Sequence, residues 1–147
     1  MAPPVHPALL GYAGYLMNVL GRKSRMRFAE ALAPLGLQPP TFGLLTIVEA
    51  EEGITQHSLG AMMGIDPSTM VGLVDQLEQA GFAERRPHPG DRRAHAVQIT
   101  AKGRRALERG RRAGQQVQEE LLGSLTPGER EELLALLRKA LEAEPIA

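Results

Sequence analysis

The 147-residue sequence contains no cysteine and no tryptophan, and aromatic residues make up only 3% of it. A chain without cysteine has no disulfide framework, no thiol redox sensor and no cysteine-ligated zinc site. No run of about 18 apolar residues is present, so we expect no membrane-spanning helix. The first ten residues lack the basic and apolar regions of a signal peptide, and we therefore expect a cytoplasmic protein.

Net charge is absent too, since 17 Lys and Arg balance 17 Asp and Glu. The average hides an asymmetry along the chain. Residues 82–112 hold ten Lys and Arg against three Asp and Glu, a net charge of +7, whereas both flanking segments are negative. A basic centre between acidic flanks fits a protein that meets a polyanion with one surface, but a solvated basic helix gives the same count.

Enzyme motifs are also lacking. We find no Ser/His/Asp or Cys/His set at motif spacing, no glycine-rich nucleotide loop after a strand, and no outstanding pair of carboxylates. The four histidines, at positions 6, 57, 88 and 95, are scattered and form no i, i+4 pair. Because a zinc site needs convergent ligands, we expect no metal, no cofactor and no enzymatic activity.

The most informative stretch comprises residues 66–100. Its first part predicts a helix that Asp66 caps and Gly81 ends, with apolar residues at helical spacing along one face. Its second part predicts two strands, residues 82–86 and 94–99, joined by a tip that contains two prolines and a glycine. A helix followed by a basic hairpin is typical of the recognition helix and wing of a winged helix-turn-helix.

The remaining segments predict helices packed around this unit. We expect helices over residues 7–35, 39–51, 56–63 and 101–122, a last helix from residue 127, and a bridging strand at residues 53–55. The short helix begins after Thr55 and is expected to bury Leu59, Met62 and Met63. A glycine-containing turn separates it from the helix at residues 67–80, which is the spacing of a helix-turn-helix.

The terminal helices indicate a second copy of the chain. Leucines on the last helix occupy more than one face, which a single chain of this size can hardly cover. In the predicted helix at residues 101–122, Gly110 and Gly114 would let a partner helix come close. We therefore infer a homodimer, with an interface that comprises Leu9, Leu10, Leu16, Val117, Leu121, Leu133, Leu137 and Leu141.

The predicted fold class is mainly α with a small β-hairpin wing, that is, a winged helix-turn-helix joined to a helical dimerisation region. A chain of this length forms one domain. We expect residues 1–147 to be that single domain. Residues from about 36 to 100 would form the winged helix-turn-helix, and residues of about 7–35 and 101–143 the dimerisation helices.

Three segments resemble the MarR family of bacterial transcriptional regulators. They are ALAPLGLQPPTFGLL at residues 31–45, DPSTMVGLVDQLEQAGFAERR at residues 66–86 and GDRRAHAVQITAKGRRAL at residues 90–107. The similarity covers nearly the full length, and DRRA followed by IT-x-x-G is its most specific part. The resemblance implies a dimeric repressor that binds a palindromic operator in double-stranded DNA and is released by a small ligand, commonly an aromatic or phenolic acid.

Positions that match the family motif suggest the DNA contacts. The resemblance implies that Arg93 enters the minor groove and that Asp91 orients it. We expect Arg85, Arg86 and Arg92 to lie near phosphates, where they position the dimer without reading sequence. The complete set of expected DNA-contacting residues is Gln56, His57, Ser68, Thr69, Val71, Gly72, Gln76, Arg85, Arg86, His88, Asp91, Arg92 and Arg93.

The sequence departs from the family at Val71 and Gly72, where members often carry a larger polar or basic residue. Gly72 either allows a close approach to DNA or is a tolerated surface glycine. Val71 either touches a thymine methyl group or packs partly against the protein. The lack of cysteine removes the peroxide-sensing branch of the family, and the lack of tryptophan argues against the urate-responsive branch.

In this family the effector pocket lies between the dimerisation helices and the DNA-binding unit. An aromatic acid needs an apolar slot and one cation, which makes Tyr12, Tyr15, Met17, Arg22 and Phe42 the candidates. Core packing is the alternative for the four apolar or aromatic residues, and a solvated helix face is the alternative for Arg22. An alternative for the whole chain is a winged-helix module that associates with proteins and does not bind DNA.

Overall fold

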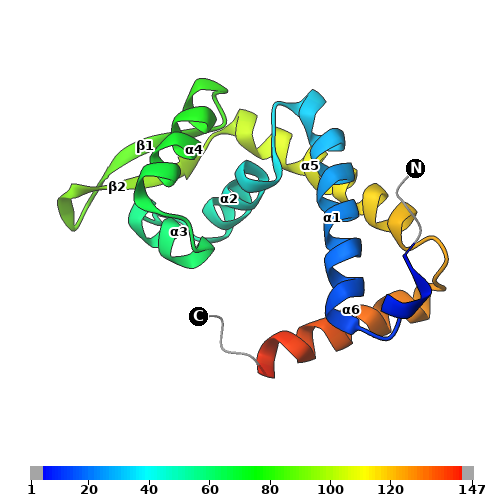
Figure 1. The fold of residues 1–147 in the computed structure, drawn as a ribbon. Coiled ribbons are helices and arrows are strands. Elements are labelled where there is room, and N and C mark those ends of the chain that lie inside the picture. The colour runs from blue at the N-terminus through cyan, green and yellow to red at the C-terminus, as the bar shows by residue number, and fades with distance from the viewer. Residues whose placement is uncertain (1–4, 144–147) are drawn as a thin grey trace.

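The computed structural model describes residues 5–143. Its elements are the 3-10 turn η1 (Pro7–Leu9), α1 (Ala13–Leu32), the 3-10 turn η2 (Ala33–Leu35), α2 (Pro39–Ala50), α3 (Gln56–Met63), α4 (Pro67–Gln79), β1 (Ala83–His88), β2 (Asp91–Ile99), α5 (Ala101–Leu121) and α6 (Pro127–Ala143). Figure 1 shows α2, α3, α4 and the hairpin as one unit, from which α5 leads to α1 and α6. The predicted fold class is confirmed.

The winged-helix unit is built on an apolar core. The stripe predicted on α4 is buried, with Val74 fully covered and Leu77 only 1% exposed. Leu44 from α2 and Leu59 from α3 are also fully buried in this core. The prediction for Met62 was wrong, because its side chain is 62% exposed. The short helix α3 turns Leu59 and Gly60 inward, and Met62 lies on its outer side.

The apolar composition of α2 follows from this core. No single helix in residues 5–143 is long and apolar enough to cross a membrane. The pair Ala13–Leu35 and Pro39–Ala50, bent by 73°, meets the same test by length and composition alone. Within this pair α2 contributes the buried residues Leu44, Leu45 and Val48, so packing inside the protein accounts for its apolar character.

The first predicted helix, over residues 7–35, proved to be three separate elements. The turn η1 ends at Leu9, and Tyr12 then takes an extended conformation before α1 begins. Gly11 lies in this break, where its poor helix propensity favours an interruption. At the other end, Pro34 belongs to the tighter turn η2, because proline disturbs the hydrogen bonds of a continuing α-helix.

The hairpin is longer than the sequence predicted. Its strands pair from Ala83 opposite Ile99 out to Pro87 opposite His95, and the register shifts between Pro87 and His88. Both strands of a two-stranded sheet have a free edge, so a proline without an N–H is tolerated. The expected bridging segment is confirmed, since the Val97 N–H donates to the Ile54 carbonyl at 2.9 Å.

Helix α5 packs against α1 and α2 of its own chain through two glycines. A Cβ atom at Gly110 would lie 2.8 Å from the Phe42 ring, and one at Gly114 would lie 3.1 Å from the Phe28 ring. The two rings meet edge to face at 5.0 Å. Val117 is only 8% exposed, so its predicted place in a dimer interface is replaced by packing within the chain.

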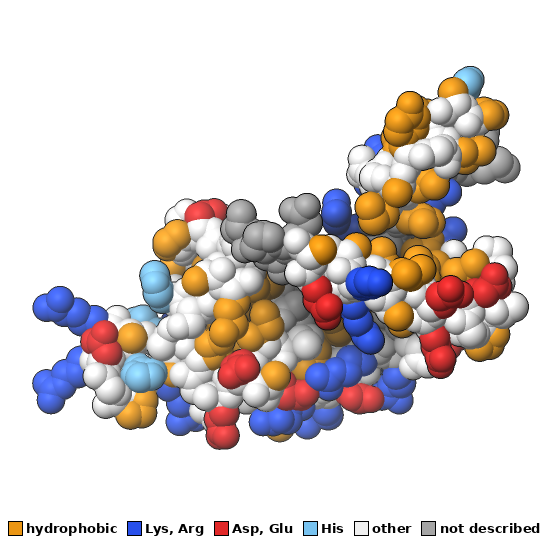
Figure 2. All heavy atoms as spheres, turned by 90° about the horizontal axis from the view of Figure 1, so that it is seen from below, with side chains coloured by type: hydrophobic (Ala, Val, Ile, Leu, Met, Phe, Trp, Pro, Cys, Tyr) orange, Lys and Arg blue, Asp and Glu red, His pale blue; other side chains and the backbone are white. Residues whose placement is uncertain are grey.

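Large apolar side chains stay exposed away from the winged-helix unit. Eight of the ten exposed large hydrophobic residues in the described chain are Leu10, Tyr12, Met17, Leu20, Met26, Leu136, Leu137 and Leu141. Along Pro127–Ala143, α6 has no buried side chain. Figure 2 shows hydrophobic atoms gathered on the part that projects at the end away from the wing. This part of the molecule therefore carries an uncovered apolar surface.

Candidate nucleic-acid interface

The first turn of α4 is organised by Asp66. Its carboxylate accepts the Thr69 backbone N–H at 2.9 Å, and it also accepts the hydroxyl groups of Thr69 at 2.6 Å and Ser68 at 2.8 Å. These bonds, with the Thr69 hydroxyl first, lower the pKa of Asp66 to about 2. The carboxylate is therefore ionised at neutral pH and holds both hydroxyl groups at the amino-terminal end of the helix.

The face of α4 opposite the core is exposed and polar. The structure places Ser68, Thr69, Val71, Gly72 and Gln76 there, all of them exposed. Beside this face, a hollow of about 370 Å³ separates α3 from α4. It is lined by Gln56, His57, Gly60, Ala61, Ile65, Pro67, Met70 and Val71. The predicted contacts on the two helices thus share one side of the winged-helix unit.

Arg85 has a different role from the one expected. Its Nε donates to Gln56 at 2.9 Å, its Nη1 donates to Asp75 at 2.6 Å and to Glu78, and its Nη2 donates to the Val71 carbonyl at 3.1 Å. Only 19% of its side chain is exposed. The guanidinium group fastens the base of the wing to α3 and α4, in place of the phosphate contact that the sequence suggested.

The remaining wing cations are exposed. Arg86 donates to Glu84 at 2.9 Å, and both side chains are more than half exposed, so the pair is weak in water. Arg92 and Arg93 form no ion pair with any carboxylate in residues 5–143. Figure 2 shows basic side chains that reach out beyond the body at the wing end. These three arginines are available to an anionic partner.

The wing tip is shaped by two local hydrogen bonds. The Asp91 carboxylate accepts the Arg93 backbone N–H at 2.9 Å, so in this structure it orients the backbone of Arg93 and not its guanidinium group. The His88 Nδ1 accepts the Gly90 N–H at 3.1 Å. Because Nδ1 is the acceptor, a neutral His88 carries its proton on Nε2.

Metal ligands do not converge in the described chain. Residues 5–143 contain no group of three or more His, Cys, Asp or Glu side chains that could hold a metal ion. His57 and His95 are exposed on α3 and β2, far apart in the sequence from His6, which caps η1. What the exposed surface does offer is the hydroxyl groups of α4 and the arginines of the wing, which suit a polyanion.

The effector residues expected from the sequence are not all brought together. Phe42 lines a hollow of about 340 Å³ between α1, α2 and α5. Its other lining residues are Ser24, Phe28, Arg111, Gly114, Val117, Gln118 and Leu121. Tyr12, Tyr15, Met17 and Arg22 lie on or before the first half of α1 and do not line this hollow. Sequence reasoning missed Phe28 and Arg111, although Gly114, which lies opposite Phe28, was a signal of close packing.

Comparisons with known proteins agree with this arrangement. The sequence model of the MarR family matches residues 37–95. The multiple antibiotic resistance protein MarR of Escherichia coli (strain K12) is 30% identical over 129 residues, which are 87% of this chain and 90% of that protein. The chain belongs to the MarR family. The resemblance in the three sequence segments is therefore confirmed.

Solved structures of similar proteins extend the match over almost the whole chain. The transcriptional repressor CouR bound to a 23-mer DNA duplex is similar with a TM-score of 0.84 and 27% identity, over 95% of this chain and 99% of that chain. CouR from Rhodococcus jostii RHA1 bound to p-coumaroyl-CoA is similar with a TM-score of 0.78 and 26% identity, over 97% and 100%. This MarR-family protein is a DNA-binding transcriptional regulator, and the family is not one of enzymes.

Gly72 offers a test of how close α4 comes to DNA. A Cβ atom at this position would meet nothing within 4 Å, so the fold does not require glycine. We expect Gly72→Ala to stabilise the protein by up to about 1 kcal/mol, because alanine favours a helix interior. Urea denaturation measures this gain, and lower stability would contradict it.

The same variant separates the two roles of Gly72 when DNA binding is measured beside stability. Weaker binding by the more stable protein identifies a close approach of the backbone to DNA, and unchanged binding identifies a tolerated surface glycine. Gly110→Ala is the matched control for the stability measurement, because it makes the same change at a crowded site, where the Cβ would lie 2.8 Å from the Phe42 ring. Such overpacking is expected to cost about 1–3 kcal/mol.

Proposed function

We propose that this regulator is a cytoplasmic repressor that binds a palindromic operator as a homodimer and leaves it when a small ligand binds. The observation that carries the proposal is that Arg85 ties the wing, with its unpaired arginines, to the exposed polar helix α4 through Asp75 and the Val71 carbonyl. A helix of this kind fits the major groove. An arginine on a wing fits a narrow minor groove, where the negative potential is strongest.

The parts of this surface have different tasks in the proposal. Ser68, Thr69 and Gln76 on α4 carry hydrogen-bonding groups but no net charge, so they supply sequence choice more than affinity. Arg86 and Arg92 contact phosphates, and Arg93 enters the minor groove. Phosphate and minor-groove contacts therefore supply most of the binding energy, and binding is strongly salt-dependent.

The homodimer is supported by the uncovered apolar side chains of α1 and α6. A palindromic operator presents two half-sites about one helical turn apart, so two linked recognition helices are needed. In the proposal residues 36–100 bind DNA, and residues 7–35 and 101–143 join the two copies. Of the predicted interface residues, Val117 is buried within the chain. The proposed interface keeps the seven leucines, namely Leu9, Leu10, Leu16, Leu121, Leu133, Leu137 and Leu141.

The hollow beside Phe42 is the place we propose for the releasing ligand. Phe28 and Phe42 form an apolar corner there, and Arg111 supplies a cation at the rim. An aromatic acid would lay its ring against the two phenylalanines and direct its carboxylate toward Arg111. At present Arg111 donates to Glu49 at 2.7 Å, so the ligand carboxylate would compete with Glu49 for this side chain.

Arg93→Ala tests the proposed wing contact. We expect the variant to bind an operator, selected from a random duplex library, more weakly by about 1–3 kcal/mol, the range for a base-directed arginine. Fluorescence anisotropy of a labelled duplex measures the change. The matched control is Arg112→Ala, which removes the same charge from an exposed site on α5. An equal loss of operator affinity in both variants would mean that Arg93 contributes only its positive charge and makes no specific contact.

A titration with random duplex at several salt concentrations tests DNA binding as such. Neutralised phosphates release counterions, so log K should fall linearly with log salt concentration. No binding at low salt, or binding that does not depend on salt, would contradict the proposal and favour a module for protein association.

A further inference from the structure

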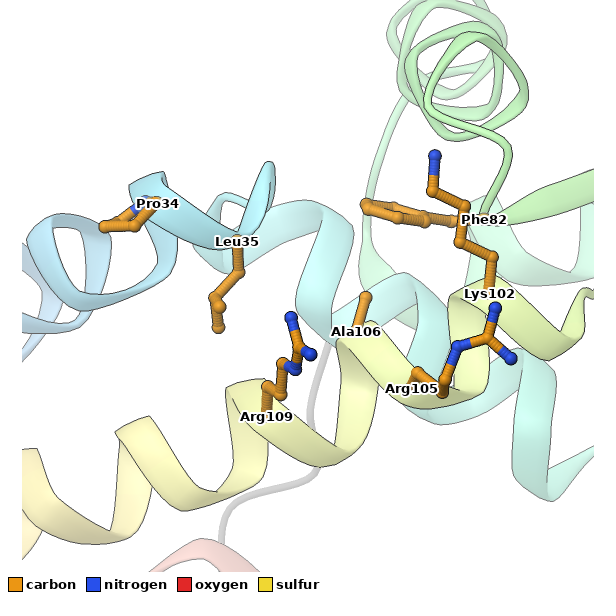
Figure 3. A pocket seen from close by; sticks show the side chains of 7 residues that line it. All are labelled: Pro34, Leu35, Phe82, Lys102, Arg105, Ala106 and Arg109. Carbon is orange, nitrogen blue, oxygen red and sulfur yellow. The ribbon is translucent and has the colours of Figure 1, made fainter.

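A second hollow, of about 320 Å³, lies where η2 approaches the first half of α5 (Figure 3). Its apolar lining is formed by Pro34, Leu35, Phe82 and Ala106. The Phe82 ring is well fixed, since it is 6% exposed and its far edge lies 3.6 Å from the position of a Cβ atom at Gly36. A flat apolar group therefore finds a preformed surface here.

Three cations line the same hollow, namely Lys102, Arg105 and Arg109. Their spacing of three and four residues places them on one face of α5. None of the three is paired with a carboxylate of residues 5–143. On another face of the same helix, Arg104 and Arg111 both lie near the Glu49 carboxylate, at 3.8 and 2.7 Å. Glu49 of α2 thus lies near one group of arginines, and the group at the hollow is left unpaired.

One of the three cations, Lys102, is partly held in place. The Lys102 Nζ lies 5.6 Å from the centre of the Phe82 ring, a cation–π contact. The Lys102 Cδ lies 3.5 Å from the position that a Cβ atom at Gly81 would take. Figure 3 shows Lys102 reaching along Phe82 and Arg109 directed toward Leu35. Lys102 is therefore partly ordered before a ligand binds, whereas Arg105 extends away from Arg109 in Figure 3, so both arginines would have to turn toward a ligand.

The hollow lies apart from the surface assigned to DNA. Phe82 follows the carboxyl-terminal end of α4, whereas Ser68 and Thr69 lie in its first turn. The 13 residues of α4 separate these ends by about 20 Å, at 1.5 Å per residue. A phosphodiester backbone is charged and would gain no binding energy from the apolar residues of the hollow. The three cations therefore fit a small ligand better than they fit the operator.

We propose that this hollow binds a phosphate ester of a flat apolar group, such as an aryl phosphate or a nucleotide. A carboxylate carries one charge, whereas a phosphate monoester carries up to two and has three acceptor oxygens, which suits a site with three cations. The ester group would lie among Lys102, Arg105 and Arg109, and the flat group would pack between Phe82 and Leu35. The proposal concerns the free protein and does not rest on the proposed repressor function.

Isothermal titration calorimetry with phenyl phosphate, inorganic phosphate and benzoate tests the proposal without DNA. We expect phenyl phosphate to bind at one saturable site per chain. Inorganic phosphate lacks the apolar group and benzoate lacks the second charge, so each should bind about tenfold or more weakly. The double variant Arg105→Gln/Arg109→Gln should lose about tenfold or more in phenyl phosphate affinity, because two charge-assisted contacts are removed.

Arg104→Gln is the matched control, because Arg104 is the neighbour of Arg105 but lies on the side of Glu49. We expect its affinity for phenyl phosphate to stay within about twofold of the unaltered protein. Both variants change exposed side chains, and thermal unfolding checks that they stay folded. Absence of saturable binding, or an equal loss in Arg104→Gln, would overturn the proposal. So would a double variant that loses duplex binding while the unaltered protein fails to bind phenyl phosphate, which would assign the three cations to DNA.

Discussion

Gly103→Ala is expected to destabilise the protein more than any other glycine-to-alanine change within residues 5–143. A Cβ atom there would lie 2.0 Å from the Phe82 carbonyl oxygen and 2.9 Å from the Ile99 Cγ1. The Phe82 carbonyl cannot easily retreat, because it accepts the Thr100 N–H at 3.0 Å. Overpacking usually costs about 1–3 kcal/mol and occasionally more, and a collision with backbone places this variant at about 3 kcal/mol or above.

Urea denaturation followed by circular dichroism measures the effect of Gly103→Ala. Because typical domains are stable by only about 5–15 kcal/mol, the variant would lose a large fraction of its stability and would unfold at a clearly lower urea concentration. Gly72→Ala is the control for the change of residue type, since open space surrounds that position. A Gly103→Ala protein as stable as the unaltered one would show that α5 does not lie this close to the start of the wing.

Removal of the chain after Ser124 is expected to abolish both the dimer and operator binding. The deletion takes away α6, which carries the exposed leucines Leu136, Leu137 and Leu141. The winged-helix unit should stay folded, because no side chain along Pro127–Ala143 is buried in it. Without a second linked recognition helix, only the weak binding of a single half-site remains.

Sedimentation velocity and fluorescence anisotropy measure the two consequences of this deletion. The matched control keeps α6 but changes its apolar face, as Leu137→Glu/Leu141→Glu in the full chain, and we expect the same monomer. A truncated protein that is monomeric and binds the operator with unchanged affinity would falsify the proposed role of dimerisation. A thermal unfolding transition shows that the core of the winged-helix unit survives in both proteins.

The elements that the sequence predicted well are those fixed by neighbouring residues. Thr55, Asp66 and Thr100 each accept the backbone N–H three residues further on, so each helix start depends on a few adjacent side chains. Gly81 ends α4 with a φ of 76°, a conformation that favours glycine. Local chemistry of this kind can be recognised without knowing the fold.

The features that the sequence did not predict depend on residues far apart in the chain. Arg85 reaches Gln56, which is 29 positions away, so its use as an internal fastening could not be told from a phosphate contact. The hollow at Phe82 likewise joins residues from Pro34 to Arg109. Five candidate effector residues were chosen by composition, and only Phe42 lines the hollow beside α5. The roles of these residues depend on the direction and packing of their side chains, and a sequence pattern does not give either.

The single guanidinium group of Arg85 has a consequence for how release from DNA would have to work. It joins α3, α4 and β1 at once, so the helix and the wing that we propose for the two grooves are coupled to each other. A ligand that moved α4 away from the wing would have to break the bonds of Arg85 to Asp75 and to the Val71 carbonyl. In the proposed dimer, control would then depend on the distance and angle between the two winged-helix units. A shift of a few ångströms at the terminal helices would change this distance, so that the two units would no longer match half-sites one helical turn apart.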